Sequence, residues 1–378
     1  MMAEGRQPDG SPEEASPGPL FVVGSMRSGS TMLRLVLDSH PHIAIGGETG
    51  FMGAVRAAKD IPNWTFGKGW YERLGWSEDE VNERLRSFYG GMFQRFAAEQ
   101  GKPRWGEKTP FHTSHMAEMS ALFPDAQFLG IVRHPGAVAA SLRKKFHFTF
   151  SEALAYWTST NLDMVEAGSR LGDRFALCRY EDLVVHGEPV LREILDFLGE
   201  SWSPDVLEHH RVQKEKGAPR TVEGSTRTQD PIDARRAAEW SRSLSGEDVT
   251  ALRESAELAA FFGYDAVAAT PDPLADHADG PARWIVDGDV LDRRRKAWGA
   301  RVDFDHRPRR PEISASYDEL AARVVRAEEA LARVRSRRAV RFVDAARKVQ
   351  HGRSWRDVRI AWSMVRAAKP GGGSGGWA

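Results

Sequence analysis

Residues 20–39 read LFVVGSMRSGSTMLRLVLDS, and this stretch is the most informative about the fold. Its first four residues are apolar and predict a buried strand, while the apolar spacing from Ser28 to Ser39 predicts a helix. Between them, GSMRSGST matches the phosphate-binding pattern G-x-x-x-x-G-K-S/T, with Ser30 in the place of the lysine. A strand, a glycine-containing loop and a helix in this order predict an anion site built from backbone N–H groups at a helix N-terminus.

The side chains of this loop add to the predicted anion site. Ser28, Ser30 and Thr31 offer hydroxyl donors, and Arg27 offers a planar cation suited to a tetrahedral oxyanion. The missing lysine argues against ATP hydrolysis, because kinases and ATPases place that lysine on the terminal phosphates and hold Mg²⁺ beside it. An ordinary Gly/Ser turn between a strand and a helix is the alternative interpretation.

Short apolar runs alternate with helical patterns as far as about Tyr264. We expect strands at residues 20–23, 128–132 and 175–180, and helices at residues 28–39, from Ser77 towards Glu99, from Pro135 onward and at residues 188–198. This alternation predicts an α/β fold with a P-loop-like, doubly wound parallel sheet flanked by helices. In such sheets, ligands bind at the carboxyl ends of the strands.

A second candidate anion site follows the strand at residues 128–132. Arg133 stands at the carboxyl end of this strand, and Ser141 lies about two turns into the next helix. Taken alone, Arg133 could equally be a surface arginine. Together with the first loop, it suggests a nucleotide that carries phosphates at both ends.

Composition excludes several classes of protein. The 378 residues contain 53 Lys/Arg and 53 Asp/Glu, which argues against a general nucleic-acid binder. The single cysteine excludes a disulfide scaffold and a thiolate zinc site. No apolar run has the length of a membrane helix, and residues 1–19 lack the pattern of a signal peptide. We therefore expect a cytoplasmic enzyme.

The charges are unevenly distributed along the chain. Residues 321–369 contain 14 Lys/Arg and 4 Asp/Glu, a net charge of +10 that the remainder of the chain balances. The expected organisation is a disordered N-terminus at 1–19, a catalytic domain at 20–268, an irregular linker at 269–315, a basic helical extension at 316–369 and a disordered Gly-rich tail at 370–378. The basic helix suits peripheral contact with the inner membrane face, a partner helix, the chain's own acidic domain or a homodimer contact. A solvated helix is the alternative.

Four motifs together resemble the sulfotransferases that use 3′-phosphoadenosine 5′-phosphosulfate (PAPS). FVVGSMRSGSTMLRLVLDSHP is similar to their 5′-phosphosulfate loop, and FLGIVRHPGAVAASL is similar to their 3′-phosphate motif. RYEDLVVHGE resembles a segment that lies near the adenine, and WGEKTPFH resembles the Lys-Ser/Thr-Pro segment of carbohydrate and tyrosylprotein sulfotransferases. The motifs occur in the family's order over about residues 20–265.

The resemblance implies roles for individual residues. Arg27, Ser28, Gly29, Ser30 and Thr31 would hold the 5′-phosphosulfate, Arg133 and Ser141 the 3′-phosphate, and Tyr180 would lie near the base. Lys108 would stabilise the bridging oxygen as the sulfuryl group leaves, and Glu48 would be the catalytic base. Residues 225–228 and the vicinity of Trp240 resemble further cofactor contacts.

The positions at which the chain departs from the family pattern indicate which group of sulfotransferases it resembles. Cytosolic steroid and phenol sulfotransferases carry a catalytic histidine two residues after the lysine, where this chain has Pro110. The chain is therefore closer to the group with a glutamate base. His112 is then a packing residue or an acceptor contact, and Glu48 without the resemblance would be a helix-capping acid. The pairs His40/His42 and His112/His115 have no third ligand at matching spacing, so no metal site is predicted.

The resulting hypothesis is a sulfotransferase that moves a sulfuryl group from PAPS to a hydroxyl acceptor, favoured to be a carbohydrate or glycolipid. A tyrosine residue and a small metabolite are the alternative acceptors. A small-molecule P-loop kinase and a non-catalytic nucleotide-binding module are the alternative functions. No nucleic-acid partner is expected.

Overall fold

The computed structural model describes residues 18–60, 69–217, 223, 230–237, 239–265 and 285–309. They all belong to the first of two units into which the chain divides, Met1–Pro311 and Glu312–Ala378. The predictions for residues 1–17, for the basic extension at 316–369 and for the tail at 370–378 lie outside the described residues.

A six-stranded sheet forms the centre of the first unit. Its spatial order is β2 (Ile43–Ile45), β3 (Arg104–Glu107), β1 (Leu20–Val23), β4 (Gln127–Val132), β5 (Phe175–Arg179) and β6 (Val286–Asp287). The strands from β2 to β5 run parallel, and β6 is antiparallel to β5. The predicted α/β fold is therefore confirmed, and the predicted parallel pairing holds from β2 to β5, whereas β6 adds an antiparallel edge strand that was not predicted.

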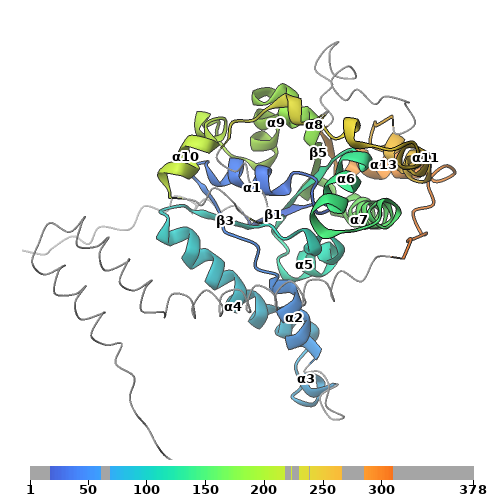
Figure 1. The fold of residues 1–378 in the computed structure, drawn as a ribbon. Coiled ribbons are helices and arrows are strands. Elements are labelled where there is room, and N and C mark those ends of the chain that lie inside the picture. The colour runs from blue at the N-terminus through green and yellow to red at the C-terminus, as the bar shows by residue number, and fades with distance from the viewer. Residues whose placement is uncertain are drawn as a thin grey trace, which may run out of the picture. The chain divides into compact units, whose positions relative to one another are not determined.

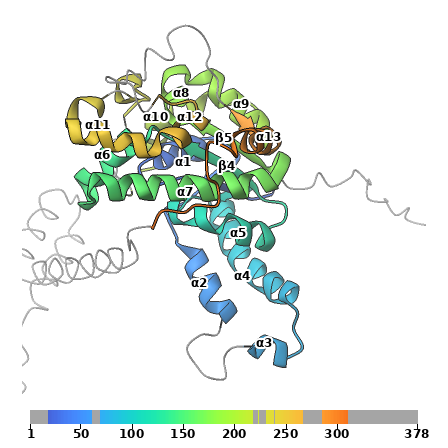
Figure 2. The same cartoon turned by 90° about the vertical axis from the view of Figure 1, so that its right-hand side faces the viewer.

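Helices pack on both faces of this sheet (Figures 1 and 2). The helices of the described residues are α1 (Ser30–Asp38), α2 (Phe51–Asp60), α3 (Trp70–Arg73), α4 (Glu78–Glu99), α5 (Met116–Leu122), α6 (Pro135–Phe146), α7 (Phe150–Leu171), α8 (Tyr180–His186), α9 (Glu188–Leu198), α10 (His209–Glu215), α11 (Gly246–Leu252), α12 (Ala256–Phe261) and α13 (Gly288–Trp298). Of these, α2 and α3 extend away from the sheet (Figures 1 and 2). The predicted capping box is present, because Ser77 and Glu80 exchange hydrogen bonds at the start of α4.

The two faces of the sheet bury different side chains. Leu20 and Val22 of β1 pack with the aliphatic residues of α1, α8 and α9. Phe21 points to the opposite face, where it meets the rings of Phe123 and Phe128 at centroid distances of 5.6 and 5.3 Å. Successive strand residues point to opposite faces, so a short apolar strand can supply both cores.

Residues 285–309 differ from the sequence prediction. They fall in the range expected to be an irregular linker, but Val286 pairs with Leu177 of β5, and α13 packs along α7. Gly288 allows this packing, because a Cβ there would lie 2.4 Å from the carbonyl oxygen of Gly172. The two-residue strand is too short for its alternation to stand out in the sequence.

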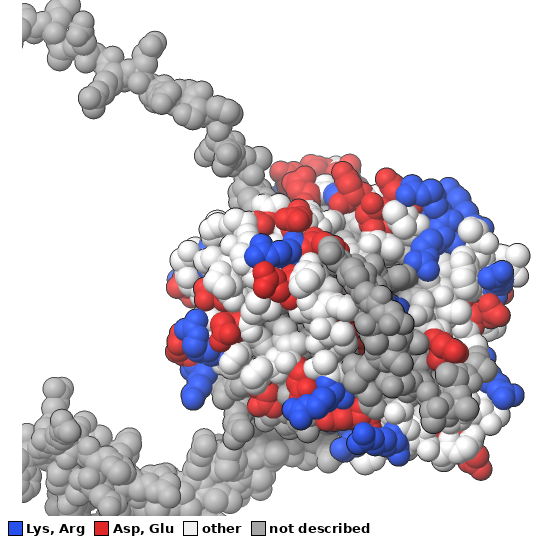
Figure 3. Space-filling model, turned by 90° about the horizontal axis from the view of Figure 1, so that it is seen from above, with Lys and Arg blue, Asp and Glu red and all other residues white. Residues whose placement is uncertain are grey.

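Among the described residues, no helix has the length and apolar character needed to cross a membrane. Figure 3 shows acidic and basic side chains on the same face of the molecule. Exposed helices carry opposite charges one turn apart, such as Arg192 and Glu188 at 2.7 Å on α9. Such exposed pairs contribute little, about 0.2–1 kcal/mol.

Candidate active site

Every parallel strand ends next to a predicted site residue. Glu48 follows β2, Lys108 follows β3, and the loop at residues 24–29 follows β1. Arg133 follows β4, and Tyr180 follows β5. The carboxyl ends of parallel strands share one edge of a sheet, so the fold gathers these segments although they are spread between residues 24 and 180 of the chain.

The loop after β1 is held by contacts from outside its own segment. The backbone N–H of Gly24 donates to Thr113 Oγ1 at 2.8 Å, and the N–H of Met26 donates to the Tyr156 hydroxyl at 3.0 Å. Gly29 has φ 100°, and a Cβ at this position would lie 2.3 Å from the Tyr180 ring. Glycine is therefore required at the point where the loop enters α1.

The start of α1 has the features of an anion site. Its N-cap, Gly29, makes no side-chain capping bond to the first turn. The hydroxyl of Ser28 is fully buried and has no hydrogen-bond partner among the described residues. A buried hydroxyl without a partner, beside uncapped helical N–H groups, fits the phosphosulfate group that the sequence predicts here.

The second predicted anion site adjoins the first. Arg27 Nε donates to Ser141 Oγ at 2.9 Å, so Ser141 on α6 reaches the loop after β1. Arg133 donates to the Arg27 carbonyl at 3.4 Å, and its guanidinium lies 4.2 Å from the Tyr180 ring centroid. Burial lowers the pKa of Arg27, and the Arg133 cation lowers it further. Two neighbouring guanidinium groups, of which that of Arg133 lies over an aromatic ring, suit an anionic nucleotide.

Lys108 joins the loop after β1 to the predicted base. Its side chain is fully buried, and its ammonium pairs with the carboxylates of Glu48 and Glu223. The same ammonium lies 3.3 Å from Thr31 Oγ1 in the first turn of α1. Lys108 thus stands beside the loop whose own sequence has Ser30 in place of a lysine.

The environment of Glu48 makes its carboxylate a stronger base. Burial raises the pKa of Glu48; Lys108 opposes this shift, whereas the carboxylates of Glu223 and Glu107 add to it. A carboxylate with a raised pKa binds a proton more readily when it lies in reach of a hydroxyl.

Glu107 supports the segment that carries Glu48. Its Oε1 accepts bonds from the backbone N–H of Thr49 at 3.3 Å and from the hydroxyls of Thr49 and Thr109 at 3.0 and 2.6 Å. Its Oε2 lies 2.8 Å from His112 Nδ1. Burial alone would raise the pKa of Glu107, but the bonds from His112, Thr109 and Thr49 bring it below its usual value. His112 is thus a buried partner of Glu107.

Glu223 is the site residue that sequence reasoning missed. It belongs to the part of the chain between α10 and residue 230. The available signal was its position two residues before 225–228, the stretch that resembles further cofactor contacts. Residues 225–228 themselves lie outside the described residues. Trp240 stacks on His134 at a centroid distance of 4.4 Å, next to the start of α6.

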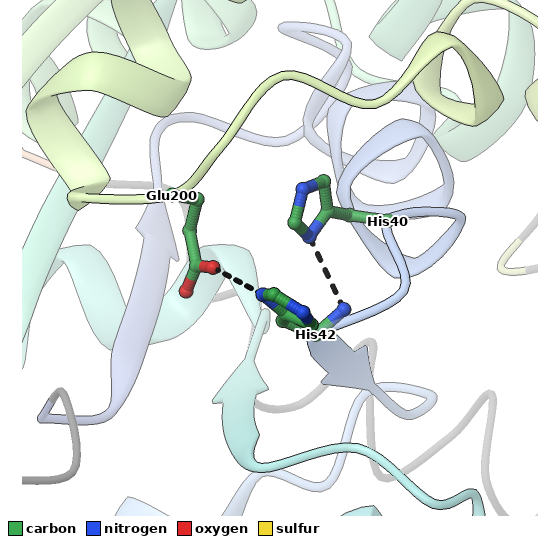
Figure 4. Close-up of side chains that lie close together, drawn as sticks. All are labelled: His40, His42 and Glu200. Atoms are coloured by element: carbon green, nitrogen blue, oxygen red, sulfur yellow. Dashed lines mark hydrogen bonds and ion pairs between the residues drawn. The ribbon is translucent and has the colours of Figure 1, made fainter.

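His40, His42 and Glu200 lie together away from these residues (Figure 4). One ligand atom of each lies within 4.8 Å of the others, so the fold supplies a third group that sequence spacing did not suggest. However, His40 Nε2 lies 2.8 Å from the Ser201 carbonyl, and His40 Nδ1 accepts the His42 N–H at 3.2 Å. Both ring nitrogens of His40 are thus engaged, as in a neutral histidine that ties segments together.

Comparison with known proteins agrees with these motifs. A model described as "Sulfotransferase family" matches residues 19–204. A "Protein-tyrosine sulfotransferase" from Drosophila melanogaster is 27% identical over 75% of this chain and 58% of its own length. A "Protein-tyrosine sulfotransferase 2" from Gallus gallus is 28% identical over 68% of this chain and 73% of its own length. The chain thus spans little more than half of the first relative.

Among solved structures, the "Sulfotransferase Domain from the Synechococcus PCC 7002 Olefin Synthase" has a TM-score of 0.45 and 24% identity, over 62% of this chain and 90% of that domain. The family match and the curated relatives confirm the resemblance to sulfotransferases, closer to the tyrosylprotein type, and support the prediction of a transferase.

Proposed function

We propose that this chain, which matches the sulfotransferase family, transfers the sulfuryl group of PAPS to the hydroxyl of a tyrosine side chain. The names of the curated relatives support tyrosine in a protein over the carbohydrate acceptor that the sequence favoured. PAPS is the donor implied by the family.

One observation carries the proposal: a buried lysine links a basic carboxylate to the phosphate loop. Lys108 contacts both Glu48 and Thr31. At this point Glu48 can accept a proton on one side of Lys108, and the loop that leads to Thr31 can bind an anion on the other side. These are the two groups that a transfer reaction needs in fixed positions.

The proposed reaction is an in-line displacement at sulfur. The acceptor oxygen forms a bond to sulfur, and the bond between sulfur and the 5′-phosphate oxygen breaks. The carboxylate of Glu48 takes the hydroxyl proton, and adenosine 3′,5′-bisphosphate leaves with the electron pair. Arg27, Lys108 and the N–H groups of the loop stabilise charge that develops on the sulfuryl and leaving oxygens.

The donor's nucleotide has matching contacts at the same edge of the sheet. Arg133 and Ser141 bind the 3′-phosphate, and Tyr180 lies under the Arg133 guanidinium, where the nucleotide would pass. This arrangement supports a bisphosphorylated nucleotide more than ATP, whose phosphates all lie at one end.

The test is sulfuryl transfer from labelled PAPS to a tyrosine-containing peptide in EDTA, with the same peptide carrying phenylalanine as control. We expect transfer to the tyrosine peptide alone. If an oligosaccharide offered in a parallel reaction became sulfated instead, the acceptor would be a carbohydrate. No transfer from PAPS, together with Mg²⁺-dependent transfer from ATP, would favour the kinase.

Replacement of the base tests the mechanism. Glu48→Gln keeps the shape of the side chain but cannot accept the proton, so we expect kcat to fall about 10²–10⁴-fold. The acidic limb of the pH profile should disappear with it. Glu118→Gln, at a half-exposed carboxylate that pairs with His115, serves as the matched control and should leave kcat unchanged. Unchanged turnover in Glu48→Gln would show that another group is the base.

A further inference from the structure

Glu223 places a carboxylate in the middle of the candidate active site. The Glu223 side chain is 10% exposed. Its Oε2 accepts the Thr31 hydroxyl at 2.9 Å and pairs with Lys108. Its Oε1 lies 3.3 Å from Arg34 Nε and accepts the backbone N–H of Glu48 at 3.2 Å.

These four groups come from three separate elements. Thr31 and Arg34 lie on α1, Lys108 follows β3, and the N–H of Glu48 belongs to the loop after β2. All four converge on one anion. Glu223 itself has φ 50°, a left-handed conformation that is unusual for a residue other than glycine. Such a backbone persists where the surroundings hold it, and here the carboxylate contacts do so.

The charges around Lys108 limit which further anion can bind there. Lys108 and Arg34 supply two positive charges, and Glu48 and Glu223 supply two negative ones. A sulfuryl group beside Lys108 and Thr31 would bring a third negative charge if Glu223 stayed. Like charges in a buried site repel strongly, so an exchange of one anion for the other is favoured.

We propose that Thr31, Arg34, Lys108 and the backbone N–H of Glu48 form the sulfuryl subsite, and that Glu223 is an internal anion which occupies this subsite until the donor's sulfuryl group displaces it. The inference rests on the proposed function, because it takes PAPS as the donor. In the free protein, the Glu223 carboxylate then holds the groups of the subsite together. A ligand group without a full negative charge would not displace this carboxylate, so it would bind more weakly.

The donor and its product differ by the sulfuryl group alone, which gives the test. We would titrate wild type, Glu223→Gln and Glu223→Ala by calorimetry with PAPS in the absence of acceptor, and with adenosine 3′,5′-bisphosphate. Both variants should bind PAPS about tenfold more tightly than wild type, a change of about 1.4 kcal/mol. Their affinity for adenosine 3′,5′-bisphosphate should change less than about twofold, because this ligand does not compete with Glu223.

Controls separate the outcomes. Glu118→Gln should leave both affinities unchanged, and melting temperatures report whether each variant is folded. An unchanged or weaker affinity of the variants for PAPS, with the bisphosphate still bound, would overturn the inference and show that Glu223 only positions Lys108. If wild type bound neither nucleotide, the proposed donor would be wrong and the inference would fall with it.

Discussion

Two buried lysines flank β3, and their different partners indicate a structural role for one and a role in the candidate active site for the other. Lys102, just before the strand, donates to the backbone carbonyls of Asp38 and Ile43 at 2.5 and 2.7 Å, and it also lies 3.9 Å from the Asp38 carboxylate. Lys108, just after the strand, donates to the side chains of Glu48, Glu223 and Thr31. A lysine bound to backbone is part of the frame, whereas one bound to side chains can exchange its partners.

The two lysines also lie at opposite ends of β3. Lys102 lies at the amino end of β3, where it ties α1 to β2, and Lys108 lies at the carboxyl end, where ligands of parallel sheets bind. Two lysines six residues apart in sequence thus have opposite expected roles, and the nature of their partners distinguishes them.

Substitution of both lysines is the strongest test of this difference. Lys108→Met should lower kcat about 10²–10³-fold, because one stabilising group for the developing charge is lost. Its free energy of unfolding should fall as well, because the largely buried carboxylates of Glu48 and Glu223 lose their cation, so kcat is compared at equal folded fraction. Lys102→Met should leave the kcat of the folded fraction unchanged and lower the free energy of unfolding, because two buried carbonyls lose their donor.

Transfer assays and urea unfolding on the two variants make this measurement. If Lys102→Met lowered kcat as much as Lys108→Met at equal folded fraction, the division between frame and site would be wrong.

Two arginines extend the comparison with a smaller effect. Arg133 faces the Tyr180 ring in the proposed nucleotide site, whereas Arg143 on α6 pairs with Asp248 at 2.8 Å. Arg133→Ala should weaken adenosine 3′,5′-bisphosphate about tenfold or more, equal to about 1.4 kcal/mol. Arg143→Ala should leave the affinity unchanged. Calorimetry in EDTA measures both, and equal losses in the two variants would place the 3′-phosphate elsewhere.

A further expected effect is a slope in stability at alkaline pH. Burial lowers the pKa of Lys102 to about 8 from an ordinary value of 10.5. Between these values the unfolded chain binds more protons than the folded one, so the contribution of Lys102 to the free energy of unfolding rises with pH over this window. Lys102→Met should remove this rise. Urea unfolding of wild type and variant at several pH values measures it, and parallel curves would contradict the assigned shift.

Local patterns allowed the donor side of the site to be predicted from sequence. A strand of four apolar residues, a glycine-containing loop and a helix are each determined by neighbours a few residues away, and so is the arginine after β4. The acceptor side was harder, because Glu48 lies in a loop whose position depends on Glu107, 59 residues later in the chain. Nothing in the sequence around Glu223 indicates that it reaches Lys108.

From the sequence alone we obtained the α/β class and the order of strand, glycine-containing loop and helix at the start of α1, and we predicted that Arg27 and Arg133 lie near an anionic ligand. The first two follow from short-range periodicity, and the placement of the arginines follows from the rule that parallel strands present their carboxyl ends at one edge. Tyr180 was added by the resemblance to sulfotransferases. The tertiary structure was needed to see that β6 and α13 join the sheet, that Ser141 reaches Arg27, and that Glu223 pairs with Lys108. Hydrogen bonds and ion pairs between distant segments depend on how the helices and strands pack. Residue type alone does not show which distant residues this packing brings together.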